Sequence, residues 1–154
     1  MAPIDSCQVP LPGSSADLIY SLAVLEHVPK AEIASFVREQ RRLIKPNGLV
    51  YHYIQPVDHS VNRDAKATGV DFLAYSRKHW DRCYQNRFQH QNRMRLPEYL
   101  LLFQQTGFEV LSLERYISPR SLQALTTMRI AEEFYPFKPA DLATTYFWVI
   151  LKPV

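Results

Sequence analysis

The sequence predicts an α/β fold, built as half of a doubly wound sheet with two parallel strands, an antiparallel closing pair and a helical insertion. Three observations carry this prediction. Residues 17–54 form a strand, an amphipathic helix and a second strand in succession. Residues 108–115 and 144–152 are two further runs rich in aromatic and β-branched side chains. Residues 56–95, between these parts, are long and basic, which is typical of a functional lid or a locally helical insertion.

The first unit is predicted from its two short apolar runs, at residues 18–21 and 49–54, which suit buried strands. Pro29 suits the first turn of the helix between them, and the turn Pro46-Asn47-Gly48 ends that helix, with a positive φ at its second or third residue. A strand, a helix and a strand in this order predict two parallel strands joined by a right-handed crossover. The apolar face of the helix is formed by Ile33, Phe36, Val37, Leu43 and Ile44.

The later elements follow from helical periodicity and from proline and glycine. Residues 97–106 are predicted as a helix with Pro97 in its first turn and Gly107 as its stop. Residues 71–80 and 119–134 show weaker helical patterns. The strands at 108–115 and 144–152 are predicted to pair antiparallel and to close the sheet.

Ligands of parallel sheets bind outside the carboxyl ends of the strands. The first predicted strand leads into residues 21–27 and the second into residues 55–59, so both loops should face one crevice. The titratable side chains of these loops are Glu26, His27, Asp58 and His59.

Composition favours one ordinary globular domain. The chain has 154 residues, of which 47% are hydrophobic and 21% charged, and this balance argues against disorder. Its two cysteines, Cys7 and Cys83, lack metal-ligand spacing, as do its five histidines, so no metal is expected. No apolar run reaches the roughly 20 residues that a membrane helix needs, and no leader pattern is present. We therefore expect a cytoplasmic protein that does not bind membranes.

Residues 56–96 hold eight Lys or Arg against four Asp, a local excess of +4 in a chain of net charge +3. A basic segment of this size can meet phosphates or nucleic acid. Because no recognised nucleic-acid motif accompanies the charge, a solvated lid with structural arginines is the preferred interpretation.

The stretch DLIYSLAVLEHV, followed by REQRRLIKPNG, resembles class I S-adenosylmethionine-dependent methyltransferases of the type 11 group. It matches their post-nucleotide strand and their turn of arginine, leucine, lysine, proline and glycine. The resemblance runs from about Asp5 onward and implies a Rossmann-like domain with three parts. These would be a cofactor-side unit (1–55), a lid and acceptor insertion (56–96), and a helix with the closing hairpin (97–154).

The family's glycine-rich cofactor motif has no counterpart here. A glycine-rich turn uses closely spaced glycines to bring backbone amides to the cofactor. The chain contains only Gly13, Gly48, Gly69 and Gly107, which are too far apart. The resemblance therefore implies the C-terminal half of a methyltransferase domain, through truncation, a wrong start site or genuine loss, and the isolated chain is expected to be inactive.

The resemblance also implies a cofactor site. Asp5 and Ser6 would lie beside the adenine ring, whose amino hydrogens a carboxylate can accept. The other reading of Asp5 is a solvent-exposed residue of an N-terminal coil. The methionine part of S-adenosylmethionine would be bordered by Ser21, Leu22 and Ala23.

On the acceptor side, His27 and His59 are the candidate catalytic bases, since an imidazole of near-neutral pKa can deprotonate a hydroxyl group. The alternative is that His27 and its neighbour only cap and pack the following helix, and that His59 is an ordinary exposed loop histidine. The candidate acceptor-binding residues are Glu26, Asp58, Asn92, Arg93 and Arg95. For the two arginines the alternative is a structural clamp on Asp58 or on loop carbonyls.

The resemblance implies methyl transfer from S-adenosylmethionine to a small hydroxyl- or amine-bearing acceptor, such as a sugar or secondary metabolite. The alternative from another class is an inactive methyltransferase-like remnant that binds a partner protein. If the strand at 18–21 lacks its neighbour, its open edge favours self-association or a partner chain.

Overall fold

The computed structural model describes residues 5–57, 64–84 and 90–154. Four strands form one sheet in the order β1-β2-β4-β3: β1 (Ala16–Leu22), β2 (Ile44–Ile54), β3 (Phe108–Ile117) and β4 (Thr144–Pro153). β1 runs parallel to β2, whereas β4 is antiparallel to both β2 and β3. The predicted α/β class, with a parallel pair and an antiparallel closing pair, is confirmed.

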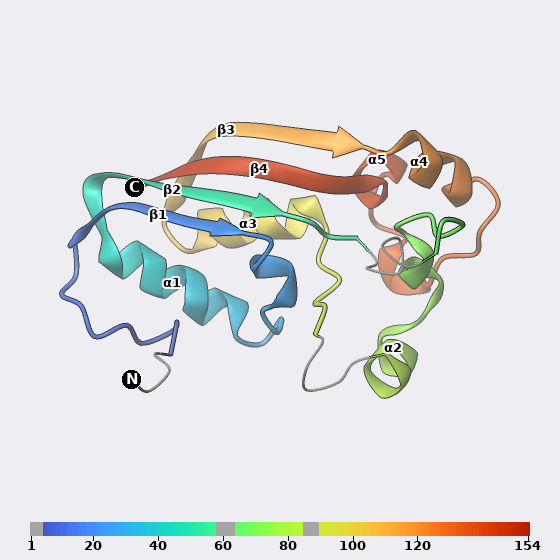
Figure 1. Ribbon diagram of the computed structural model, residues 1–154, viewed down its shortest axis with the longest axis horizontal. Coiled ribbons are helices and arrows are strands. Elements are labelled where there is room, and N and C mark those ends of the chain that lie inside the picture. The colour runs from blue at the N-terminus through green and yellow to red at the C-terminus, as the bar shows by residue number, and fades with distance from the viewer. Residues whose placement is uncertain (1–4, 58–63, 85–89) are drawn as a thin grey trace.

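Two helices cover one face of the sheet, α1 (Ile33–Leu43) and α3 (Leu96–Gln105) (Figure 1). Their apolar side chains meet those of the central strands, because alternate residues of β2 and β4 point toward the helices. The largest fully buried members of this core include Leu25, Ile44, Ile54, Tyr99, Phe103, Phe147 and Leu151.

The start of α1 and its connection to β2 differ from the sequence prediction. The backbone amides of Glu32 and Ile33 donate to the carbonyl of Pro29, so Pro29 opens a turn that precedes α1. The chain then passes directly from α1 into β2 at Ile44, without a positive φ. Gly48 is required for space, because a Cβ atom there would lie 2.7 Å from Ile44 Cδ1 and 2.9 Å from the carbonyl oxygen of Asp17.

The insertion and the segment before β4 are packed together. The expected helix at 71–80 is divided into η3 (Asp71–Ala74) and α2 (Arg77–Cys83) by Ser76, whose side chain caps α2. The expected helix at 119–134 is limited to α4 (Pro119–Leu125), followed by η4 (Glu132–Phe134) and α5 (Pro139–Leu142). A second apolar cluster joins them and consists of Val70, Phe72, Leu73, Trp80, Phe134 and Leu142. The described part of the insertion thus contributes to a core.

The opposite face of the sheet carries no helix among the elements that the structure describes (Figure 1). The run at 18–21 was expected to be buried, but only Ser21 is, while Leu18 and Tyr20 are 60% and 68% exposed. Register places their side chains beside those of β2, and an aromatic row of Tyr53, Trp148, Tyr146 and Tyr116 continues across β4 and β3. We call this surface the open face. It is formed by Leu18, Tyr20, Leu22, Leu49, Tyr51, Tyr53, Tyr116, Tyr146 and Trp148.

Candidate functional site

The carboxyl ends of β1 and β2 are shaped by a left-handed residue. Ala23 has a φ of 53°, an unusual value for a residue with a side chain, and its amide donates to the Tyr53 carbonyl at 2.9 Å. The chain turns there into η1 (Leu25–His27). This turn places Glu26 and His27 where the two parallel strands end.

His27 is held in one tautomer. Its Nδ1 atom lies 2.7 Å from the carbonyl oxygen of His90, which can only accept a hydrogen bond. The proton of a neutral His27 ring therefore resides on Nδ1, and Nε2 carries the basic lone pair. A basic lone pair is one requirement of a general base, which must also reach the acceptor. His27 is not among the residues that line the cavity between α2 and α3.

Glu26 is almost fully buried beside His27. Its Oε1 atom accepts from the Gln55 amide at 3.2 Å, while Oε2 has no hydrogen-bond partner among the described residues. Burial raises the pKa of this carboxyl group, despite the opposing hydrogen bonds. Glu26 therefore joins the loops after β1 and β2.

Asn92 ties this turn to α3. Its Nδ2 atom donates to the carbonyls of Leu25 and Val28 at 2.7 and 2.9 Å, and its Oδ1 atom accepts from the Met94 amide and the Tyr99 hydroxyl. All these partners belong to the chain itself. The contacts of Asn92 thus fix the loop that carries His27.

Arg93 and Arg95 both donate hydrogen bonds to backbone carbonyl groups. Arg95 is fully buried and donates to the carbonyls of Pro56 and Thr144 at 2.7 and 2.9 Å, and burial lowers its pKa to about 10. Arg93 donates through Nη2 to the carbonyls of Phe72 and Tyr75. These contacts are those of the structural clamp on loop carbonyls that the sequence left open as an alternative.

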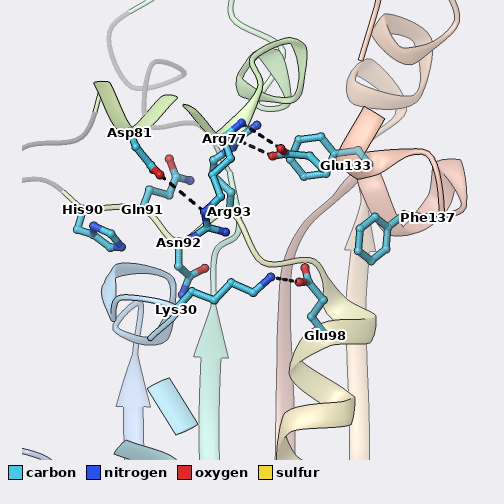
Figure 2. A pocket seen from close by; sticks show the side chains of 11 residues that line it. Lys30, Arg77, Asp81, His90, Gln91, Asn92, Arg93, Glu98, Glu133 and Phe137 are labelled. Carbon is cyan, nitrogen blue, oxygen red and sulfur yellow. Dashed lines mark hydrogen bonds and ion pairs between the residues drawn. The ribbon is translucent and has the colours of Figure 1, made fainter. Parts of the chain in front are cut away.

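A cavity of about 120 Å³ lies beyond the carboxyl ends of β1 and β2, between α2, the start of α3 and the segment around η4 (Figure 2). Arg93 lines it, whereas Arg95 does not. Charged side chains of both signs face it from four parts of the chain. The lining residues are Lys30, Arg77, Asp81, His90, Gln91, Asn92, Arg93, Glu98, Glu133, Phe134 and Phe137.

The expected cofactor residues are not all brought together. Ser21, Leu22 and Ala23 lie at the end of β1, but Asp5 and Ser6 are exposed on a segment that runs below α1 (Figure 1). The Asp5 carboxylate accepts from the Cys7 amide at 2.8 Å and so stabilises its own turn. Of the acceptor-side candidates, Asp58 and His59 lie outside the described residues.

The amino-terminal segment is fixed to α1 by hydrogen bonds between its backbone and the side chains of Arg42 and Glu39. Arg42 donates to the carbonyls of Val9 and Leu11 at 3.0 and 2.9 Å and also to both carboxylate oxygens of Glu39. The hydrogen bonds from Arg42 lower the pKa of Glu39. This clamp explains why the segment follows α1.

Sequence reasoning missed a buried polar relay under the site. His52 Nδ1 lies 2.8 Å from Ser21 Oγ and its Nε2 lies 3.1 Å from Gln40 Oε1, so the ring donates to Gln40 and accepts from Ser21. His52 also stacks on Phe103. The available signal was alternation in β2, which places His52 on the same buried face as Val50. The relay fixes the Ser21 hydroxyl as a donor into the core.

The relay predicts a pH-dependent stability. Burial lowers the pKa of His52 to about 4 from an ordinary 6.5, so the unfolded chain binds this proton first as the pH falls. The contribution of His52 to the free energy of unfolding is fully present above pH 6.5. It falls by about 3 kcal/mol on acidification toward pH 4. Urea denaturation at several pH values should show this loss in the wild-type chain and a smaller one in His52→Gln, which keeps His90, whose pKa burial also lowers. An unchanged pH dependence in His52→Gln would contradict the assignment, and His79→Gln on the surface is the matched control.

A family model described as a methyltransferase domain matches residues 4–113. The chain belongs to the methyltransferase-domain family. No curated protein matches the sequence significantly. In the part of the methyltransferase chain that the structure describes, no helix is long and apolar enough to cross a membrane, and no group of His, Cys, Asp or Glu is placed to hold a metal ion.

Solved structures show the same fold at low identity. The [4+2]-cyclase SpnF is 16% identical with a TM-score of 0.58, and the match covers 99% of this chain and 56% of that one. A methyltransferase from Mesorhizobium loti, described as S-adenosylmethionine-dependent, is 16% identical with a TM-score of 0.56, covering 97% and 67%. The 1,6-didemethyltoxoflavin-N1-methyltransferase of Burkholderia thailandensis is 12% identical with a TM-score of 0.56, covering 98% and 49%. The present chain thus spans roughly half to two thirds of these structures.

Proposed function

We propose that this methyltransferase-family chain provides the acceptor side of S-adenosylmethionine-dependent methyl transfer to a small hydroxyl- or amine-bearing molecule, such as a sugar or secondary metabolite. The observation that carries the proposal is His27, held with its basic Nε2 atom at the strand ends of a methyltransferase-family sheet. The fold alone would not suffice, since one neighbour is described as a cyclase.

S-adenosylmethionine, when bound, supplies a methyl group on a positively charged sulfur. In the proposed reaction His27 Nε2 takes the proton that the acceptor oxygen or nitrogen loses, while the bond to the methyl carbon forms and the sulfur keeps the electrons of the broken bond. His59 is proposed as a second base. Asp58 is proposed to bind the acceptor with Glu26, Asn92, Arg93 and Arg95.

The cofactor residues are proposed on the same basis. Ser21, Leu22 and Ala23 would border the methionine part, and Asp5 and Ser6 the adenine. Support comes from two structural neighbours whose descriptions name bound S-adenosylhomocysteine, the demethylated cofactor. We also propose that the protein works in the cytoplasm, where two free cysteines stay reduced.

The direct test is methyl transfer from radiolabelled S-adenosylmethionine. The assay needs a fusion in which the glycine-rich strand, turn and helix of a related domain precede Asp5. Screening this fusion against small alcohols, sugars and amines should reveal labelled product. A fusion that binds the cofactor tightly and labels no acceptor would argue against the proposal.

Protein binding is the second candidate function, and the open face is the observation that favours it. Leu18, Tyr20 and Leu22 are all more than half exposed, and β1 pairs only with β2 among the described strands. The free edge of β1 contains neither proline nor lysine, which usually discourage pairing between chains. A partner chain, or a second copy, can therefore be expected to bind there.

We expect the isolated chain of 154 residues to self-associate or to require a partner, and to bind S-adenosylmethionine very weakly. The physical reasons are the open face, the free edge of β1 and the absence of closely spaced glycines. Light scattering measures the first property, and calorimetric titration measures the second. A monomer that saturates at micromolar cofactor would require a cofactor site built from residues 5–154, and Tyr20→Lys is expected to reduce association.

A further inference from the structure

We propose that the cavity beyond β1 and β2 binds a carboxylate or phosphate group through Lys30, Arg77 and Arg93, and that the methyl acceptor carries this group. The second half of this statement rests on the proposed function. The first half is independent of it, because it concerns the hydrogen-bonding capacity of the cavity wall. Figure 2 shows these cations and their carboxylate neighbours around the cavity.

Two of the three carboxylates that line the cavity, Glu98 and Glu133, already have partners within the chain. Glu98 accepts from Lys30 through Oε1 and from the Arg95 amide through Oε2 at 2.8 Å. Glu133 accepts from the Arg77 amide through Oε2 at 3.0 Å. Its other oxygen lies 3.1 Å from Arg93 Nη1. Each of these carboxylate oxygens is thus engaged by the chain itself.

The cations, in contrast, have donors to spare. Arg93 Nε is buried with no hydrogen-bond partner among the described residues, and the Arg93 side chain is only 6% exposed. Lys30 uses one of its three N–H groups, on Glu98. The Arg77 guanidinium has one described partner, Asp81, at the long distance of 3.7 Å. The cavity wall therefore keeps unused N–H groups on Lys30 and Arg93, which suit an anionic group rich in acceptor oxygens. Such a group would compete with Asp81, the third lining carboxylate, for Arg77.

Arg93 is also held rigidly. Its guanidinium lies over the rings of Phe134 and Trp80, at 4.8 and 5.2 Å from their centroids, and Nη2 is bonded to two carbonyls. Its backbone φ of 60° is in the left-handed region, a strained value for a side chain of this size. Burial lowers the pKa of Arg93, and Glu133 partly opposes this effect. A preorganised donor of this kind loses little freedom when it binds an anion.

The test is a titration of the chain with inorganic phosphate and, separately, with acetate, at constant ionic strength set by chloride. Amide chemical shifts around the cavity report binding without any cofactor. The variants are Arg77→Gln and Arg93→Lys, and Lys78→Gln is the control, because Lys78 lies on the same helix but does not line the cavity. We expect about tenfold weaker binding in Arg93→Lys and several-fold weaker binding in Arg77→Gln, as for the loss of one charge-assisted hydrogen bond.

Arg77 is largely exposed, so Arg77→Gln keeps the test decisive even where Arg93→Lys fails to fold. Saturation by phosphate alone assigns a phosphate group, and saturation by acetate alone assigns a carboxylate. Binding of neither anion, or equal binding by Arg77→Gln and the wild-type chain, would overturn the inference. Equal weakening by Lys78→Gln would also overturn it, since it would indicate general surface attraction only.

The two proposals fail in different ways. Phosphate binding that depends on Arg77, in a fusion that transfers no methyl group, would leave the anion site standing and refute the proposed function. Methyl transfer that neither phosphate nor acetate inhibits competitively against the acceptor would refute the anionic acceptor and leave methyl transfer standing.

Discussion

Replacing His27 with alanine is expected to lower the turnover of methyl transfer by about 10²- to 10⁴-fold, the range typical of a lost general base. The affinity for S-adenosylmethionine should stay near the wild-type value. The reason is that His27 is proposed to act on the acceptor, whereas Ser21, Leu22 and Ala23 are proposed to border the methionine part of the cofactor. Single-turnover rates and calorimetric titration of the fusion protein measure the two quantities. His59→Ala is expected to act in the same direction.

His27→Asn separates base catalysis from positioning. The asparagine amide can still donate to the carbonyl of His90, but it has no basic lone pair. Turnover as low as in the alanine variant would support a base, and turnover near wild type would mean that His27 only holds the loop. Unchanged turnover in both His27→Ala and His59→Ala would leave proximity and orientation as the whole mechanism. His79→Ala, at an exposed position of α2, is the control.

Replacing Arg95 with methionine is expected to destabilise the chain by about 2–4 kcal/mol. Methionine fills much of the same apolar space but leaves the carbonyls of Pro56 and Thr144 without their charged donor. The loss is smaller than the two hydrogen bonds together, because the variant no longer buries a charge. Urea denaturation measures it.

The stability of Arg95→Lys should fall between that of the wild-type chain and that of Arg95→Met, since an ammonium group cannot span two separated carbonyls as a guanidinium does. Arg38→Met, at an exposed position of α1, is the matched control and should change stability by less than about 0.5 kcal/mol. Wild-type stability in Arg95→Met would show that the two carbonyls find other partners.

The elements with strong local signals could be predicted from the sequence. The helix at 97–106 was bounded by Pro97 and by Gly107, whose φ of 84° ends it as expected. The helix at 119–134 was overextended, because its apolar spacing continues into residues that pack as separate turns. At 71–80 the local cap at Ser76 decided the break. The spacing of apolar residues indicates which side chains are buried, but it does not indicate where the chain changes direction.

The site was less predictable, because its contacts join residues far apart in the sequence. Ser21, Gln40 and His52 meet only once β1, α1 and β2 are assembled. For Arg95, clamping and acceptor binding could not be separated by sequence, since both use the same donors. The geometry adds that its donors reach backbone carbonyls of distant segments.

The position of β4 has a consequence for how the chain folds. β4 lies between β2 and β3, and it pairs Leu151 with Val50, a residue more than half the chain length away. Closing so long a loop costs entropy before any contact repays it, so we expect slow folding limited by the docking of β4. During synthesis β1, α1 and β2 leave the ribosome before β4 is made. The apolar surfaces that they bury against β4 therefore stay exposed until β4 docks. We therefore expect the nascent chain to depend on chaperones, as a consequence of the strand order.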